Sequence, residues 1–276
     1  MKEVLFTVKE NAAIAPGVFK MRLEGDTSAV TRPGQFVSIS VESFFLRRPF
    51  SVCDRDRGSL TVCYRVTGGG TEKMSSLGRG ERLSALTGLG NGFDTEKAGD
   101  RPLLIGGGMG ATPLLYLARA LVAEGKSVTA VLGFKTKAES ILISELEKAG
   151  ARVLVCTEDG SLGEKGIVTE LMARTDYSYF YACGPEAMLR AVEKSAVSGG
   201  EMSLEAALGC GFGACMGCSI ETISGAKRVC RDGPVFERGE VIWTQKLACP
   251  ALRFQTPSFP PPAPSATAGS LRSFTI

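Results

Sequence analysis

Four cysteines in the C-terminal third of the chain have a spacing that could hold an iron–sulfur cluster. A [2Fe–2S] cluster needs four thiolates on a loop that can wrap two irons, and C-x4-C-x2-C followed by a more distant cysteine is the plant-type ligand spacing. The pattern here is C-x4-C-x2-C-x11-C, formed by Cys210, Cys215, Cys218 and Cys230. These four residues are the predicted metal ligands.

Glycines between these cysteines favour the cluster over zinc. Gly211, Gly213 and Gly217 let the backbone curl close to the sulfur atoms and turn N–H groups toward them. An all-cysteine zinc site, the alternative, more often has two C-x2-C pairs, and this segment has one. Cys249 lies outside the pattern and is expected to be a free thiol.

A second candidate site is the glycine-rich stretch GGGMGATP, residues 106–113, between an apolar strand and a helix. Such a turn lets a pyrophosphate approach backbone N–H groups at a helix start, although a turn needed only for packing is the alternative. The stretch is not G-x-G-x-x-G, and residues 133–135 (Gly-Phe-Lys) supply no acid for a ribose hydroxyl. Lys135 and Lys137 would suit a 2′-phosphate, so NADP stays open beside NAD.

A third candidate site combines RRPFSV, residues 47–52, with CYR at 63–65 and a Gly-Thr pair at 70–71. The simplest interpretation of RRPFSV alone is a strand with a basic edge. Together with a short helix beginning near the Gly-Thr pair, it would form a second diphosphate site. We expect Thr71 to be the N-cap of that helix.

Composition excludes several classes of function. The chain has 276 residues without histidine, which removes His bases, Ser-His pairs and His-ligated metals. Lys and Arg total 32 against 29 Asp and Glu, a net charge of +3, so neither nucleic acid nor an anionic membrane is an expected partner. We find neither a secretory signal nor a membrane span, and expect a reducing cytoplasm, where clustered cysteines bind metals.

The elements that position these motifs change in type along the chain. Short alternating runs separated by Gly, Pro and Asp predict an antiparallel β-barrel over 1–99. Alternating apolar strands and helices, including a helix over 138–150, predict a doubly wound α/β domain over 100–203. A Cys/Gly module too poor in apolar runs to have its own core follows over 204–248. Residues 249–276 are Pro-rich and predicted to be a disordered tail, with a docking peptide as the alternative.

Taken in order, these motifs resemble the ferredoxin-reductase superfamily. Within it the chain is most similar to the electron-transfer subunits of class B, NAD-dependent dihydroorotate dehydrogenases. The resemblance covers about residues 1–248. It depends on RPFS, YRV-x3-GT, GGGMGATPL, TEDGSLGEKG, YACGPEAML and, most specifically, CGFGACMGC with KRVCRDGPVF.

The resemblance implies a role for each matching residue. Arg48 would pair with the FAD diphosphate, cradled by Gly70 and Thr71, while Pro49, Phe50 and Ser51 would follow the isoalloxazine. Cys63, Tyr64 and Arg65 would line the adenine or ribitol side. Gly107, Gly108 and Gly110 would face the NAD diphosphate. Cys183, Gly184, Pro185 and Glu186 would lie by the nicotinamide, although Cys183 could simply be a buried apolar residue.

By the same resemblance, electrons would pass from the FMN of a separate catalytic subunit through the cluster and FAD to NAD+, in a heterotetramer of two of each subunit. No catalytic side chain is expected, because hydride transfer between flavin and nicotinamide needs no protein base. Thr157, Glu158 and Asp159 would be positional or only a turn. The rivals are a subunit of an NADH-dependent ferredoxin:NADP or sulfide oxidoreductase, and a zinc-stapled redox sensor or binding module without catalytic activity.

Overall fold

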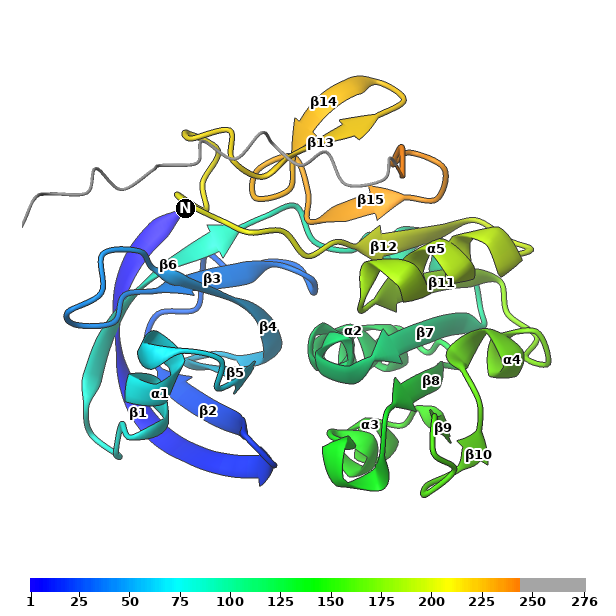
Figure 1. The fold of residues 1–276 in the computed structure, drawn as a ribbon, viewed down its shortest axis with the longest axis horizontal. Helices are drawn as coiled ribbons and strands as arrows, with labels where there is room; N and C mark the ends of the chain where they lie inside the picture. Colours follow the sequence, from blue (N-terminus) through cyan, green and yellow to red (C-terminus); the bar gives the residue numbers. More distant parts are fainter. Residues whose placement is uncertain (244–276) are drawn as a thin grey trace, which may run out of the picture. The chain divides into compact units, whose positions relative to one another are not determined.

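Six antiparallel strands of the computed structural model close into a barrel in the order β1-β2-β5-β4-β3-β6 (Figure 1). Alternate residues point inward, as in β6, where every second residue is buried. The enclosed core includes Phe6, Val8, Met21 and Val62. The strands are β1 (Lys2–Ala15), β2 (Val18–Glu24), β3 (Phe36–Ile39), β4 (Arg48–Asp56), β5 (Ser59–Arg65) and β6 (Arg82–Leu89).

The short helix of the barrel is α1 (Gly69–Ser75), and its N-cap is Gly68. The prediction that Thr71 is the N-cap is wrong, because Thr71 lies at the third helical position. From there its hydroxyl accepts hydrogen bonds from the backbone N–H groups of Thr67 and Gly68, at 3.0 and 3.3 Å. Thr71 therefore supplies the reciprocal half of a capping box rather than the cap itself.

The second sheet has seven strands in the order β10-β9-β8-β7-β11-β12-β15. All are parallel except β15, which pairs antiparallel with β12. The strands are β7 (Pro102–Gly107), β8 (Thr129–Phe134), β9 (Arg152–Thr157), β10 (Glu164–Lys165), β11 (Tyr179–Cys183), β12 (Gly200–Ser203) and β15 (Val235–Glu237).

Helices cover both faces of this sheet, with α2 and α3 on one side and α4 and α5 on the other (Figure 1). Strand residues alternate between the two apolar layers: Leu104 packs with α2, whereas Leu103 and Ile105 pack with α4 and α5. The structure thus confirms the predicted fold class of an antiparallel barrel followed by a doubly wound α/β unit. The helices are α2 (Thr112–Ala123), α3 (Ile143–Lys148), α4 (Val168–Met172) and α5 (Glu186–Ser195), with 3-10 turns η1 (Thr95–Ala98), η2 (Gly108–Ala111) and η3 (Lys137–Glu139).

The helix predicted over 138–150 is partly wrong. Residues 137–139 form the 3-10 turn η3, and α3 begins only at Ile143. Leu142 separates the two with a left-handed backbone conformation, φ 62°. Both Ile141 and Leu142 are buried, so tertiary packing of these side chains prevails over the helical propensity of the segment.

The segment after β12 packs on both earlier units. Its hairpin of β13 (Ser219–Thr222) and β14 (Gly225–Arg228) stands alone, while β15 extends the parallel sheet. Val229, Cys230 and Phe236 share an apolar cluster with Phe36 and Leu89 of the barrel. This sharing agrees with the expectation that the segment cannot form a core by itself, whereas its strand in the large sheet was not predicted.

The structure describes residues 1–243. The predicted tail over 249–276, Cys249 and the end of the predicted 204–248 module lie outside the described residues. Among the helices of residues 1–243, none is both long and apolar enough to cross a bilayer.

Candidate functional site

A cavity of about 420 Å³, here called the barrel-side cavity, opens between β4 and β5 of the barrel and the start of α2. Pro49, Phe50 and Ser51 line it from β4, and Cys63, Tyr64 and Arg65 line it from β5. The structure therefore brings six of the predicted flavin-site residues around one space. Thr112, Pro113 and Cys183 close the opposite wall.

Tyr64 gives this cavity a rigid aromatic wall. Its ring packs between those of Phe19 and Phe50, with centroids 5.7 and 5.6 Å away. Its hydroxyl donates a 2.8 Å hydrogen bond to Asn11 Oδ1, and burial raises the pKa of Tyr64 to about 12. A neutral, fixed aromatic surface of this kind suits contact with a planar ring system.

Arg48, Gly70 and Thr71 lie together beside Phe44 but line neither cavity described here. The Arg48 guanidinium carbon is 4.6 Å from the centre of the Phe44 ring. A Cβ atom on Gly70 would come within 2.3 Å of Arg48 Nε, so a side chain at that position would displace the guanidinium. The absence of a side chain at Gly70 thus permits this position of Arg48 at the start of α1.

A second cavity of about 590 Å³, here called the sheet-end cavity, lies at the carboxyl ends of β7, β8 and β9. Ligands of open parallel sheets bind at this edge. The predicted Gly107, Gly108, Gly110 and Pro185 line it. Predicted Gly184 and Glu186 line neither cavity, and Glu186 forms an ion pair with Arg190 at 3.7 Å.

The glycines at this edge serve two purposes. A Cβ atom on Gly110 would lie 2.1 Å from the carbonyl oxygen of Cys183, and one on Gly107 would lie 2.5 Å from Met188 Sδ. Gly110 therefore requires glycine for packing, which was the alternative interpretation of this motif, whereas at Gly107 the flexible Met188 side chain would have to move. Gly108 differs, because nothing stands within 4 Å of its Cβ direction and its φ is +53°. Its backbone borders the cavity directly.

Two carboxylates at the sheet-end cavity were missed by the sequence analysis as ribose ligands. Glu139 comes from η3 and Glu158 from the residue after β9, and both line the cavity with Lys135. Glu139 also pairs with Arg65 across the two units, at 3.5 Å. The sequence analysis expected Glu158 only to be positional or part of a turn. The strand order places the ends of β8 and β9 side by side, which brings Glu158 into the cavity that Lys135 lines.

Cys183 ends β11 and lines the barrel-side cavity. Burial, followed by the nearby Glu205 carboxylate, raises the pKa of its thiol to about 12. A buried neutral thiol is chemically inert, so Cys183 can shape this wall but is not a nucleophile at neutral pH.

The four clustered cysteines lie in two pairs. Cys210 and Cys215 face solvent at least in part, and Cys218 and Cys230 are buried. Cys210 Sγ accepts hydrogen bonds from the N–H groups of Ala214 (3.2 Å) and Cys215 (3.4 Å), and Cys218 Sγ accepts one from Cys230 (3.4 Å). Within residues 1–243, no three ligand-type side chains stand close enough to enclose a metal ion.

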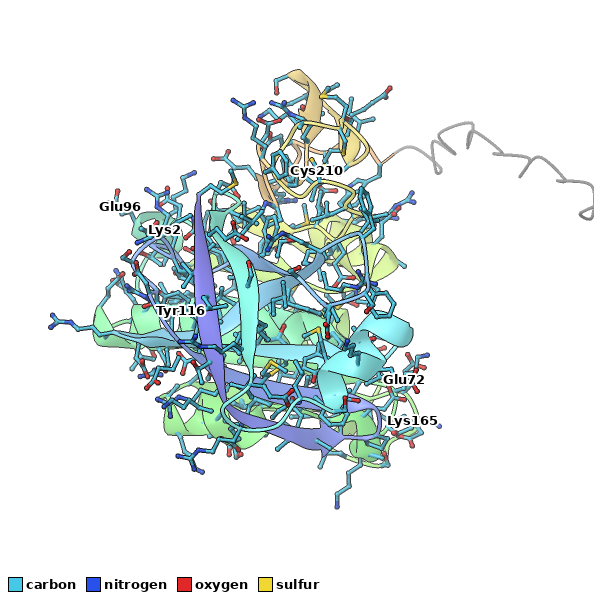
Figure 2. All side chains as sticks on the ribbon, turned by 90° about the vertical axis from the view of Figure 1, so that its left-hand side faces the viewer. Lys2, Glu72, Glu96, Tyr116, Lys165 and Cys210 are labelled. Carbon is cyan, nitrogen blue, oxygen red and sulfur yellow. The ribbon has the colours of Figure 1, made fainter. Side chains whose placement is uncertain are left out.

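The loop nevertheless has the donor chemistry of a thiolate-ligated cluster. Burial opposes ionisation of Cys210, but N–H groups from Cys215, Phe212 and Ala214 outweigh it and lower the pKa of its thiol to about 6. Backbone N–H groups directed at sulfur are the contacts that stabilise thiolate ligands. Cys210, labelled in Figure 2, lies on this loop beside the barrel, where a Cβ on Gly211 would approach Ser38 Oγ to 3.6 Å.

The same segment also contributes to the barrel-side cavity. Leu208, Val229 and Pro234 line it beside the barrel residues. The sequence analysis missed these side chains, since isolated apolar residues in a Gly-rich segment carry no signal of their neighbours. All three parts of the fold thus meet at one cavity.

Two family models match the chain. The model described as the iron–sulfur cluster binding domain of dihydroorotate dehydrogenase B matches residues 205–242, and the oxidoreductase NAD-binding domain matches residues 104–194. The first match contains all four clustered cysteines. The second contains the glycine turn and the ends of β7, β8, β9 and β11.

Curated relatives match over almost their full length. The dihydroorotate dehydrogenase B (NAD(+)) electron transfer subunit of Geobacillus sp. (strain WCH70) is 40% identical over 88% of this chain and 99% of the relative. The protein of the same name from Streptococcus mutans serotype c is 39% identical over 88% of this chain and 98% of the relative. Among solved structures, the NADH-dependent reduced ferredoxin-NADP oxidoreductase matches with TM-score 0.78 at 30% identity, covering 86% of this chain and 90% of that chain.

Proposed function

This chain belongs to the family of dihydroorotate dehydrogenase B (NAD(+)) electron transfer subunits, and from that membership we propose that it passes electrons from a dihydroorotate-oxidising catalytic subunit to NAD+. The reaction would serve pyrimidine (UMP) biosynthesis. The predicted family is confirmed, as is the predicted cofactor set of FAD, a [2Fe–2S] cluster and NAD. The chain is thus the NAD-dependent component of an oxidoreductase.

The observation that carries this function is the shared lining of the barrel-side cavity. Residues of the barrel, of the α/β unit and of the cysteine segment all border it, and Arg65 and Met109 border the sheet-end cavity as well. When bound, FAD exchanges electron pairs with a nicotinamide and single electrons with an iron–sulfur cluster. This shared lining supports our proposal that the three sites lie next to each other.

In the proposed flavin site, Pro49, Phe50 and Ser51 contact the isoalloxazine, and Arg48 with Gly70 and Thr71 holds the diphosphate. Arg48 suits this role because its guanidinium is held over Phe44 beside the start of α1. Charge-assisted hydrogen bonds to phosphate are about twice as strong as neutral ones. Cys63, Tyr64 and Arg65 form the adenine or ribitol side.

In the proposed NAD site, Gly107, Gly108 and Gly110 face the diphosphate at the end of β7. Cys183 at the end of β11 and Pro185 just after it line the two cavities and would border the nicotinamide end, whereas Gly184 and Glu186, proposed for the same end, line neither cavity. Glu139 and Glu158 give this cavity carboxylates for ribose hydroxyls, the kind of group that favours NAD over NADP. Lys135 is the opposing charge in the same cavity.

Cys210, Cys215, Cys218 and Cys230 are the proposed cluster ligands. The match of residues 205–242 to an iron–sulfur domain favours the cluster over zinc, the alternative for this cysteine set. The partly exposed Cys210 and Cys215 would face the route to the partner subunit. The two buried cysteines would anchor the loop on the barrel.

The name of the relatives implies a catalytic partner subunit. We propose that this partner contains FMN and that two copies of each subunit assemble.

We also propose that the chain divides into domains at 1–99, 100–203 and 204–248. We propose a reducing cytoplasm as its compartment.

Dihydroorotate-dependent reduction of NAD+ by the gently isolated native complex tests this function, with NADP+ as the comparison. NADH formation on addition of dihydroorotate is the expected result. A coloured complex that NADH reduces but that ignores dihydroorotate would contradict the proposed substrate. A colourless protein that contains zinc and no flavin would contradict the cofactor chemistry as well.

A second candidate function is that of the NADH-dependent reduced ferredoxin-NADP oxidoreductase, because its structure covers 86% of this chain at 30% identity. The two functions differ in the donor rather than in the sites of this chain. Reduction of the flavin by NADPH much faster than by NADH, without a response to dihydroorotate, would favour this second function.

A further inference from the structure

Three residues line both cavities: Arg65 at the end of β5, Met109 in η2 and Glu205 just after β12. In the proposed function, they mark the boundary where a dinucleotide in the sheet-end cavity would meet a ring system in the barrel-side cavity. The three come from the barrel, the α/β unit and the cysteine segment. A residue at this boundary would therefore lie near both ligands of the proposed function.

The charge at this boundary is not balanced. Arg65 has a counterion, since its guanidinium lies 3.5 Å from Glu139 Oε2, and Met109 is neutral. Glu205 differs, because no group within residues 1–243 forms a hydrogen bond or an ion pair with its carboxylate. The side chain is exposed to the two cavities, and the surrounding protein raises its pKa by removing water.

A carboxylate without a partner in a partly desolvated place is costly and gains most from an incoming cation. The oxidised nicotinamide ring carries a positive charge, whereas the reduced ring is neutral. We infer that Glu205 is a positioning residue that selects NAD+ over NADH by placing its carboxylate beside the cationic ring. The inference rests on the proposed function and adds a specificity-determining residue to the NAD site.

The charge of Glu205 would thus favour capture of the oxidised nucleotide and release of the reduced one, while hydride transfer itself would have to overcome the same attraction. Oxidised NAD+ would be held while its ring is positive, and the attraction would disappear once the ring becomes neutral. NADH would then leave more readily than NAD+. Neither the glycine turn nor Pro185 can provide this difference, because none of these residues of the cavity wall carries a charge that could distinguish a positive ring from a neutral one.

Replacement of Glu205 by Gln tests the inference, because it keeps the shape and removes the charge. The purified holoprotein is titrated in two states that cannot react: NAD+ into the oxidised protein, and NADH into the fully reduced protein under anaerobic conditions. The Kd for NAD+ is expected to rise about fivefold to twentyfold in Glu205→Gln, the effect of one partly screened charge pair. The Kd for NADH is expected to change less than about twofold.

Two further variants separate charge from structure. Glu205→Asp keeps a carboxylate and is expected to recover most of the NAD+ affinity. Glu96 is an exposed residue of η1, labelled in Figure 2, and lines neither cavity. Glu96→Gln removes the same charge there and is expected to change neither Kd. The flavin content of each variant is measured first, so that a misfolded protein is recognised.

Equal losses of NAD+ and NADH affinity in Glu205→Gln, or no loss of either, would overturn the inference. If the variant does not fold, the salt dependence of binding to the wild-type holoprotein tests the inference. Added salt should raise the Kd for NAD+ more than the Kd for NADH, and an equal rise in both would overturn the inference as well. A wild-type holoprotein that binds neither nucleotide would instead refute the proposed function, so the two failures are distinguishable.

Discussion

Gly110 shows how one residue joins the packing of the fold to the proposed NAD site. A Cβ atom there would lie 2.1 Å from the carbonyl oxygen of Cys183 and 2.6 Å from the backbone nitrogen of Gly184. Backbone atoms cannot rotate away as a flexible side chain can, so the glycine turn and the end of β11 would have to separate. These are the segments that border both cavities.

Gly110→Ala is therefore expected to lower stability by about 1–3 kcal/mol, as overpacking does, and to weaken NADH binding to the reduced protein at least about tenfold. Gly78→Ala is the matched control for stability, because a Cβ there would meet only the end of the flexible Glu81 side chain, at an ordinary 3.5 Å. Thermal denaturation and nucleotide titration measure the two effects. A Gly110→Ala protein as stable as Gly78→Ala would contradict the packing shown here.

Cys215 is the most exposed of the four proposed cluster ligands, so its side chain can be removed with little effect on the core. Cys215→Ala is expected to lose the iron and acid-labile sulfide of the cluster. NADH-to-dye activity at the flavin should persist, while coupling to the catalytic partner should stop. Cys53→Ala, which removes a buried thiol of the barrel, is the control and should keep its iron. Full iron content in Cys215→Ala would refute the assignment.

Among the elements, α1 depends on its first turn, because a helix of seven residues has few internal hydrogen bonds. Thr71 Oγ1 accepts from two backbone N–H groups and donates to the carbonyl of Gly68, at 2.9 Å. Thr71→Ala is expected to cost about 1 kcal/mol, seen as a lower Tm, and Thr71→Ser should retain most of the stability.

Ser76 provides the comparison at the other end of α1. Its exposed hydroxyl donates a single 2.8 Å hydrogen bond to the Lys73 carbonyl oxygen. Ser76→Ala is expected to change stability by less than about 0.5 kcal/mol, as surface substitutions usually do. Equal Tm values for Thr71→Ala and Ser76→Ala would show that the capping box contributes nothing.

Sequence patterns predicted elements well where the pattern is local. Alternation of apolar residues identified the barrel, and the strand-turn-helix order at GGGMGATP identified the parallel sheet. Predictions failed where distant packing decides, as at Leu142, which interrupts a helical sequence, and at β15, which joins the sheet from the far end of the chain. Three residues of β15 carry no periodicity that could reveal its partner.

The candidate site divides in the same way. Cysteine spacing and glycine turns are visible in the sequence, because those chemistries need particular residue types close together. Glu139 and Glu205 were not predicted as members of the site, and Glu158 was expected only to be positional or part of a turn, since a carboxylate becomes a site residue only through the strand ends beside it. The predicted roles of the site residues and the predicted domain boundaries remain predictions.

Across the whole molecule, a charge cluster connects all three parts. Lys97 follows the barrel, Glu201 lies in β12 and Glu237 lies in β15. The Lys97 amine forms an ion pair with Glu237 and lies 3.8 Å from Glu201 Oε1. Glu201 Oε2 also accepts a 2.9 Å hydrogen bond from the N–H of Asp94. Only 4% of Glu201 is exposed, and burial raises its pKa to about 7 despite these partners.

The raised pKa makes the connection between the parts sensitive to pH. Between its unfolded value near 4.5 and about 7, the folded protein binds more protons at Glu201 than the unfolded chain does. Glu201 therefore makes its full contribution to the free energy of unfolding below about pH 4.5. This contribution is lost as the pH rises through 7. Asp94 and Glu237 add to the raised pKa, whereas Lys97 opposes it.

Glu201→Gln removes this titration while an amide oxygen can still accept from Asp94. The variant is expected to gain about 1–3 kcal/mol relative to wild type between pH 5 and pH 8, measured as the difference in Tm at each pH. Titrations elsewhere in the chain cancel in that difference. If the difference in Tm between the variant and wild type stays constant across this range, Glu201 is ionised at all these pH values. The three parts would then be joined here by permanent charges rather than by a carboxyl group that resists ionisation.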